Sequence, residues 1–114
     1  MATLREQQVK FARDLAELVL WIDDQPGYEC TIAEVLRPQI VQNQYLREGT
    51  TKVMHSKHQD KLAADIMIYK AGVYLTKTED YAFMGAHWKS LDTENVWGGD
   101  WKSIRDGNHV QRGV

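Results

Sequence analysis

The sequence predicts a small α+β domain built on an antiparallel sheet. Helical and strand periodicities alternate along the chain, and its clearest strand signal is a hairpin, whose two strands must run antiparallel. The chain has 114 residues, of which 43% are hydrophobic and 26% charged, so it can bury one modest core. We therefore expect one domain over residues 1–114, with an N-terminal helix over residues 3–23 and a core over 28–110 that carries the polar motifs.

The composition argues against several classes of protein. The formal net charge is −2, so the chain as a whole does not attract nucleic acid or an anionic membrane. Cys30 is the one cysteine, which excludes an intramolecular disulfide and a cysteine-based zinc site. The longest apolar run near the N-terminus, residues 18–22, is too short for a membrane span or a signal peptide. We expect no export signal and no stable membrane association.

The first predicted element is an amphipathic helix. Its apolar positions recur at helical spacing: Leu4, Phe11, Leu15, Leu18 and Ile22. The turn sequence Asp-Gln-Pro-Gly at residues 24–27 ends it. Tyr28, Cys30 and Ile32 then alternate with polar neighbours, as in a half-buried strand. After Pro38, residues 39–47 resemble a short helix that Gly49 closes.

The second half of the chain contains the hairpin. Two apolar runs over residues 65–75 flank Lys70-Ala71-Gly72, which predicts a three-residue loop with glycine at a positive φ. Residues 78–90 indicate a second helix. The remaining tail is rich in Trp, Gly and Asp and is expected to be mostly loop.

Two pairs of polar residues are candidates for a metal site. His58 lies seven residues before Asp65, in the loop that precedes the predicted strand, and Asp106 and His109 follow an Asp-x-x-His spacing with a glycine between them. Imidazole nitrogens and carboxylate oxygens are zinc ligands, and a carboxylate beside the metal can accept the proton of an activated water. Spacing alone leaves the alternative open that these are ordinary surface or capping residues.

The other candidate residues favour structural roles. His55 is expected to be a loop residue or a neighbour of the ligands, and His87 a packing or surface residue. Cys30 is expected to pack as a small hydrophobic residue. The tryptophans at positions 88, 97 and 101 either form an aromatic shelf or pack the tail, and packing is favoured. Arg37 either donates to a substrate carboxylate or oxyanion, or is solvated.

The motifs together resemble a known family. The segment from Ser56 to Asp65 is similar to the Ser-x-His-x-x-x-x-Ala-x-Asp signature of zinc peptidases that cut bacterial cell-wall peptides. That family includes D-alanyl-D-alanine carboxypeptidases, vancomycin-resistance dipeptidases and L-alanyl-D-glutamate endopeptidases of phage endolysins. Further matches follow in the family's order, over residues 28–110. They are Glu34 to Arg37 with Gln44, Tyr45 and Gly49, then residues 80–88, 97–101 and 106–109.

The resemblance implies specific roles and a Hedgehog-like or D-alanyl-D-alanine-peptidase-like fold. It implies His58, Asp65 and His109 as Zn²⁺ ligands and Asp106 as the general base. Arg37 matches, more loosely, the arginine thought to bind substrate or to stabilise the oxyanion.

The chain departs from the family pattern at two places. Many members carry glycine three residues after the first histidine, where this chain has Lys61. Members usually continue the last motif as His-Phe-Glu, whereas here Val110 and Gln111 follow His109. The second departure removes a carboxylate next to a ligand, which would tune metal affinity or rate.

The resemblance implies a zinc metallopeptidase that hydrolyses peptidoglycan stem peptides. We expect an L-alanyl-D-glutamate endopeptidase of a phage or prophage endolysin, acting as a monomer without nucleic acid. Without an export signal, the protein would stay in the host bacterial cytoplasm until a membrane lesion released it to the cell wall. The alternatives are a D-alanyl-D-alanine carboxypeptidase, a non-catalytic zinc-containing wall-binding module and a phage tail component. Asp106 argues against the binding module, because binding alone needs no base beside the metal.

Overall fold

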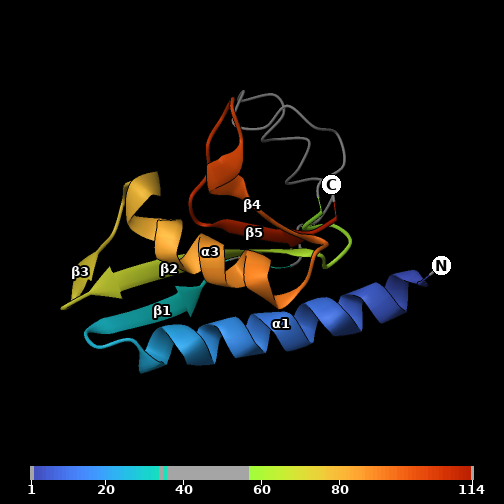
Figure 1. Ribbon diagram of the computed structural model, residues 1–114, viewed down its shortest axis with the longest axis horizontal. Coiled ribbons are helices and arrows are strands. Elements are labelled where there is room, and N and C mark those ends of the chain that lie inside the picture. Colours follow the sequence, from blue (N-terminus) through green and yellow to red (C-terminus); the bar gives the residue numbers. More distant parts are fainter. Residues whose placement is uncertain (1, 34, 36–56, 114) are drawn as a thin grey trace.

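The computed structural model describes residues 2–33, 35 and 57–113 (Figure 1). The helix expected over residues 39–47 therefore lies outside the described residues. The elements in chain order are α1 (Leu4–Asp24), β1 (Tyr28–Ile32), β2 (Ala63–Lys70), β3 (Val73–Tyr74), the 3-10 helix η1 (Thr78–Tyr81), α3 (Ala82–Leu91), β4 (Asn95–Trp97), the 3-10 helix η2 (Gly98–Asp100) and β5 (His109–Arg112).

The five strands form one antiparallel sheet in the order β1-β2-β5-β4, with β3 paired to the end of β2. Strand β2 has different neighbours along its length. Residues 63–65 pair with β5, whereas residues 66–70 pair with β1. This confirms the expected α+β fold with an antiparallel sheet.

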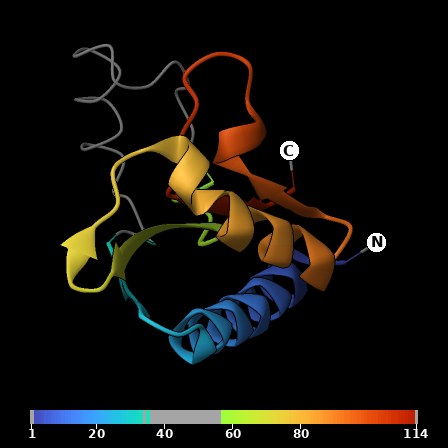
Figure 2. The ribbon, with the colours of Figure 1, turned by 60° about the vertical axis from the view of Figure 1, so that its left-hand side comes forward.

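Helices α1 and α3 pack together against one face of the sheet (Figures 1 and 2). Phe11 of α1 meets Trp88 of α3 edge to face, with ring centroids 5.5 Å apart. Ala64, Ile66 and Ile68 of β2 and Val110 of β5 join them in the core. Because side chains alternate along a strand, Asp65 and His109 must point to the opposite face.

Helix α1 begins one residue later and ends one residue later than residues 3–23. Thr3 caps it, because its hydroxyl accepts a hydrogen bond from the backbone N–H of Glu6. Asp14 is a buried acidic residue of this helix, 2% exposed. Its two oxygens accept hydrogen bonds from Lys10 Nζ at 2.5 Å and Asn95 Nδ2 at 3.1 Å. No helix in the described part of the chain is both long and apolar enough to cross a membrane.

The hairpin loop is shorter than expected. Lys70 pairs with Val73, so the loop has two residues, Ala71 and Gly72, both with positive φ (50° and 79°). Two consecutive positive φ angles are typical of a type I′ turn, whose twist matches that of the flanking strands. Glycine is at a positive φ as predicted, but the expectation of a three-residue loop was wrong.

The region after the hairpin also differs from expectation. The second helix begins as the 3-10 helix η1, and α3 follows it from Ala82. The tail expected to be mostly loop contributes strands β4 and β5 to the sheet. Trp97 of β4 packs against α3 so closely that a Cβ on Gly85 would lie 2.2 Å from its ring. Glycine at position 85 thus allows this helix to approach the sheet.

Candidate metal centre

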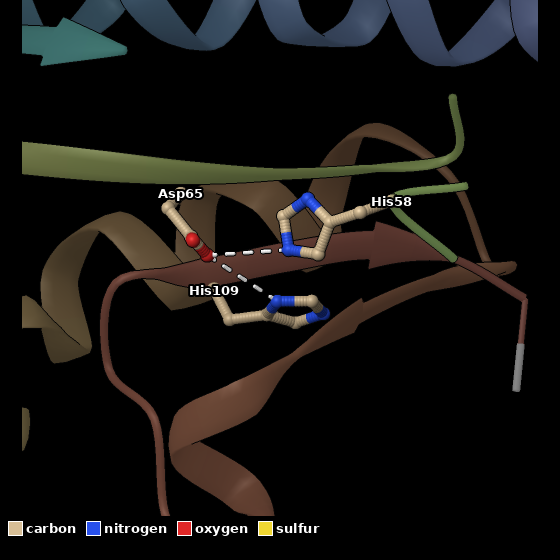
Figure 3. A group of neighbouring side chains, drawn as sticks. All are labelled: His58, Asp65 and His109. Carbon is tan, nitrogen blue, oxygen red and sulfur yellow. Dashed lines mark ion pairs between the residues drawn. The ribbon is translucent and has the colours of Figure 1, made fainter. Parts of the chain in front are cut away.

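Three side chains, two close in sequence and one more than forty residues further on, converge on the face of the sheet opposite the helices (Figure 3). Asp65 of β2 and His109 of β5 are cross-strand partners, so their side chains project together. The Oδ1 atom of Asp65 lies 3.4 Å from His109 Nδ1 and 3.5 Å from His58 Nε2. The ring centroids of the two histidines are 5.1 Å apart.

His58 is presented by a tight turn just before β2. The turn is closed by a hydrogen bond from the Leu62 N–H to the carbonyl of Lys57, at 2.9 Å. Lys61 completes the turn with a φ of 57°, in the left-handed region. A residue with a Cβ adopts this region at a steric cost that glycine does not have. Lys61 therefore adopts a backbone conformation that glycine would adopt without this cost.

The cluster is largely shielded from water, but its central oxygen makes no hydrogen bond to any part of the chain that the structure describes. His58 and His109 are buried, and the Asp65 side chain is 24% exposed. Asp65 Oδ1 is buried without a hydrogen-bond partner, and its distances to the two ring nitrogens exceed an ordinary N–H···O bond. Burial raises the pKa of the Asp65 carboxyl, but the interactions with His109 and His58 outweigh it and hold the pKa well below its usual range.

This arrangement fits a zinc ion. One donor atom from each residue lies within 4.8 Å of the other two. Ligand atoms about 2.0–2.2 Å from a tetrahedral zinc are about 3.3–3.6 Å apart, which agrees with the two N···O distances between Asp65 and the histidines. Two imidazoles and a carboxylate form a donor set of the kind found in catalytic zinc sites, where a fourth position stays open.

Asp106 lies in a turn that leads directly into the cluster. Its carbonyl accepts a hydrogen bond from the His109 N–H at 3.2 Å, and its own N–H donates to Gly98. A Cβ on Gly98 would lie 2.3 Å from the carbonyl oxygen of Asp106, so only glycine at position 98 allows the two backbone segments to come this close. Burial and the charge of Asp65 raise the pKa of the Asp106 carboxyl above its ordinary value, against the opposing charge of His109. Asp106 is thus electrostatically coupled to the cluster.

Two further residues contact His109. The Oε1 atom of Gln111 lies 2.7 Å from His109 Nε2, although the sequence indicated only the loss of a carboxylate there. The ring centroid of Trp101 lies 4.9 Å from that of His109. Because His109 and Gln111 are two residues apart, a strand prediction for this segment would have placed their side chains on the same face and so indicated their contact.

The other candidate residues lie elsewhere. Arg37 and His55 fall outside the described residues, so the roles suggested for them stay predictions. His87 stacks on Trp21 with ring centroids 4.0 Å apart, which confirms a packing role.

Trp88 and Trp97 belong to the core rather than to an aromatic shelf. Cys30 is half-buried, and burial raises the pKa of its thiol, as expected for a packing residue.

Comparison with known proteins agrees with the fold. A family model described as D-alanyl-D-alanine carboxypeptidase matches residues 48–112. The L-Ala D-Glu endopeptidase ChiX of Serratia marcescens has a similar structure, with a TM-score of 0.70 and 26% identity over 92% of this chain and 77% of that one. A search of curated proteins found no match.

A second similar structure is a mutant of the vancomycin-resistance D,D-pentapeptidase VanY, from a VanB-type resistance cassette, in complex with Zn(II). Its TM-score is 0.62, with 16% identity over 91% of this chain and 71% of that one. At this identity the likeness concerns the fold alone. Fold and family model together define a peptidase. The chain belongs to the D-alanyl-D-alanine carboxypeptidase family, which confirms the resemblance seen in the sequence.

Proposed function

We propose that this protein is a zinc-dependent hydrolase of peptidoglycan stem peptides that cleaves the bond between L-alanine and D-glutamate. The observation that carries the proposal is the buried Oδ1 of Asp65, which has no hydrogen-bond donor among the described residues and lies between two imidazoles. The similarity to the L-Ala D-Glu endopeptidase ChiX, which extends over 92% of the chain, supports the choice of bond.

Each residue of the site has a role in this proposal. His58, Asp65 and His109 hold the metal. When bound, zinc acts as a Lewis acid and lowers the pKa of water toward 7. Asp106 accepts the proton of the attacking water and transfers it to the leaving amine as the peptide C–N bond breaks. Arg37 is proposed to stabilise the oxyanion or to bind a substrate carboxylate.

We further propose that the protein acts as a monomeric endolysin of a phage or prophage. It would accumulate in the host cytoplasm and reach the wall through a membrane lesion. The support for this role is the resemblance of its motifs to those of phage endolysins.

A D-alanyl-D-alanine carboxypeptidase is the second candidate. The description of the matching family model favours it. The same donor set and the same base would serve both reactions, because both hydrolyse an amide bond. The two candidates differ only in which bond of the stem peptide is presented to the site.

The decisive experiment is digestion of purified Gram-negative peptidoglycan with and without a chelator, followed by mass spectrometry of the new termini. A chelator-sensitive product with a new D-glutamate amino terminus is expected. Loss of terminal D-alanine would instead establish the carboxypeptidase. No product from folded, zinc-loaded protein would overturn both and favour a wall-binding module.

A matched control uses another carboxylate from the same tail. Asp100 is exposed, and its carboxylate pairs with Lys89 Nζ at 2.6 Å rather than with a residue of the cluster. Asp100→Asn should digest the wall like the wild type, whereas Asp106→Asn should not.

A further inference from the structure

Gln111 is a buried amide held directly behind a proposed metal ligand. It lies two positions after His109 on β5, so both side chains project from the same face of the sheet. Its backbone is fixed on both sides, by Ala63 of β2 and Val96 of β4. The side chain is almost inaccessible to water, at 8% exposure for the residue.

The hydrogen bonds of Gln111 determine which way its amide points. The amide Nε2 donates to the carbonyl of Gly113 at 2.6 Å. A carbonyl oxygen only accepts hydrogen bonds, so the amide nitrogen must face Gly113 and the amide oxygen must face His109. Gly113 is itself fixed, because its N–H donates to the carbonyl of Glu94 at 2.8 Å.

This orientation determines the position of the hydrogen on the neutral His109 ring. The Gln111 oxygen only accepts, so His109 Nε2, 2.7 Å away, must carry the hydrogen. Nδ1 then carries the lone pair and faces Asp65 and the centre of the cluster. Asp65 does not compete with Gln111 for the ring hydrogen, because its Oδ1 lies 3.4 Å from Nδ1, which is longer than an ordinary hydrogen bond.

We propose that Gln111 is a positioning residue that keeps the hydrogen of His109 on Nε2 and so presents Nδ1 as a metal ligand. The effect of Gln111 on metal binding rests on the proposed zinc site, whereas its effect on the His109 tautomer is independent of that proposal. A carboxylate would also accept from Nε2, but its second oxygen would face the Gly113 carbonyl with no hydrogen to share. An amide satisfies both neighbours.

The test is nitrogen-15 NMR of the imidazole rings in the metal-free protein. The spectra are recorded at mildly alkaline pH, and the nitrogen-15 shifts themselves distinguish a neutral ring from a protonated one. The His109 signals are assigned by their loss in His109→Gln. Wild type is expected to show the Nε2–H tautomer, and Gln111→Leu a mixture or the Nδ1–H form. An Nδ1–H tautomer in the wild type would overturn the proposal.

Zinc affinity is the second measurement. Gln111→Leu is expected to bind zinc 10- to 100-fold more weakly, the usual effect of losing a partner behind a ligand. Gln111→Glu should retain the tautomer and restore the affinity, which a purely structural role would not require. If Gln111→Leu does not fold, the wild-type spectrum and Gln111→Glu still decide the question.

The matched control is Asn95→Leu, which removes another buried amide, 6% exposed, from the neighbouring strand β4. It should lower stability while leaving the His109 tautomer and the zinc affinity unchanged. Equal loss of affinity in Asn95→Leu and Gln111→Leu would overturn the proposal. A wild type that binds no zinc would refute the metal centre, and the metal-free tautomer would still test Gln111.

Discussion

Two carboxylates on opposite sides of the sheet have opposite environments, and Asp14 is buried whereas the Asp65 side chain is 24% exposed. Both oxygens of Asp14, on the helical side, accept hydrogen bonds from Lys10 and Asn95. Asp65, on the other side, has an oxygen that is buried without a hydrogen-bond donor, between the rings of His58 and His109. The two residues have the same chemistry and differ in what the fold places around them.

The difference distinguishes a structural carboxylate from one placed to bind a ligand. A buried polar group without a hydrogen bond costs about 1–3 kcal/mol, so a fold that retains one usually has a use for it. Both oxygens of Asp14 already accept hydrogen bonds from protein groups, so this carboxylate does not require a bound ligand. The Oδ1 atom of Asp65 has no hydrogen-bond donor in the described part of the chain, and a bound cation would interact with this oxygen instead. The following predictions test this contrast, beginning with the largest expected effect.

Asp65→Asn should abolish zinc binding and with it peptidoglycan cleavage, because a neutral amide is a poor zinc ligand. The metal content of the purified protein and the release of wall peptides measure both effects. Asp14→Asn is the control and should retain zinc and activity while folded. Stoichiometric zinc in Asp65→Asn would contradict the proposed ligand set.

Asp106→Ala should reduce cleavage by about 10²–10⁴-fold, the usual contribution of a general base, while zinc stays bound. Single-turnover digestion of a defined stem peptide would measure the rate. Wild-type activity in this variant would show that the proton is accepted by a different group.

Added zinc should stabilise the wild type by about 2.7 kcal/mol when free zinc is 100 times its Kd, provided that zinc binds only the folded state. Urea unfolding with and without zinc measures the shift. Asp14→Ala should show the same shift and Asp65→Asn none. If zinc also raised the free energy of unfolding of Asp65→Asn, the zinc would have to bind at a different site.

Asp14→Ala should lower the free energy of unfolding by about 1–3 kcal/mol, because Asn95 and Lys10 lose their shared acceptor. Equilibrium unfolding of the metal-free protein measures it. An unchanged free energy of unfolding would show that Asp14 contributes nothing as the acceptor of these two hydrogen bonds.

Lys61→Gly should raise the free energy of unfolding by about 0.5–1 kcal/mol. Relief of the left-handed backbone contributes about 1–2 kcal/mol, and the greater freedom of unfolded glycine cancels part of it. Chemical denaturation of the metal-free protein is precise enough for this comparison. A loss of stability would mean that the lysine side chain contributes more than the strain costs.

The elements predicted well from the sequence are those whose signals are local. The period of α1 and the Asp-Gln-Pro-Gly turn after it lie within one segment, and so does the hairpin of β2 and β3. Strands β4 and β5 were missed because they have only three and four residues. Their conformation comes from pairing with each other and with β2, which is distant in sequence.

The site was predicted less directly. Spacing alone could not distinguish ligands from surface residues, and the family pattern selected His58, Asp65 and His109. The structure brings these three together. The contact of Gln111 with His109 was not foreseen, because it depends on two side chains sharing one face of a strand that the sequence did not reveal. Arg37 stays a prediction from the family pattern.

The divided pairing of β2 also has a consequence for the order of folding. His58 and Asp65 are close in sequence, but His109 reaches them only when β5 pairs with residues 63–65. Contacts between such distant segments form slowly, because closing a long loop costs conformational entropy before the favourable contacts can form. The complete donor set therefore exists only in the finished tertiary structure. Metal capture would follow the docking of β5 rather than nucleate it, and refolding should begin at the same rate with or without zinc.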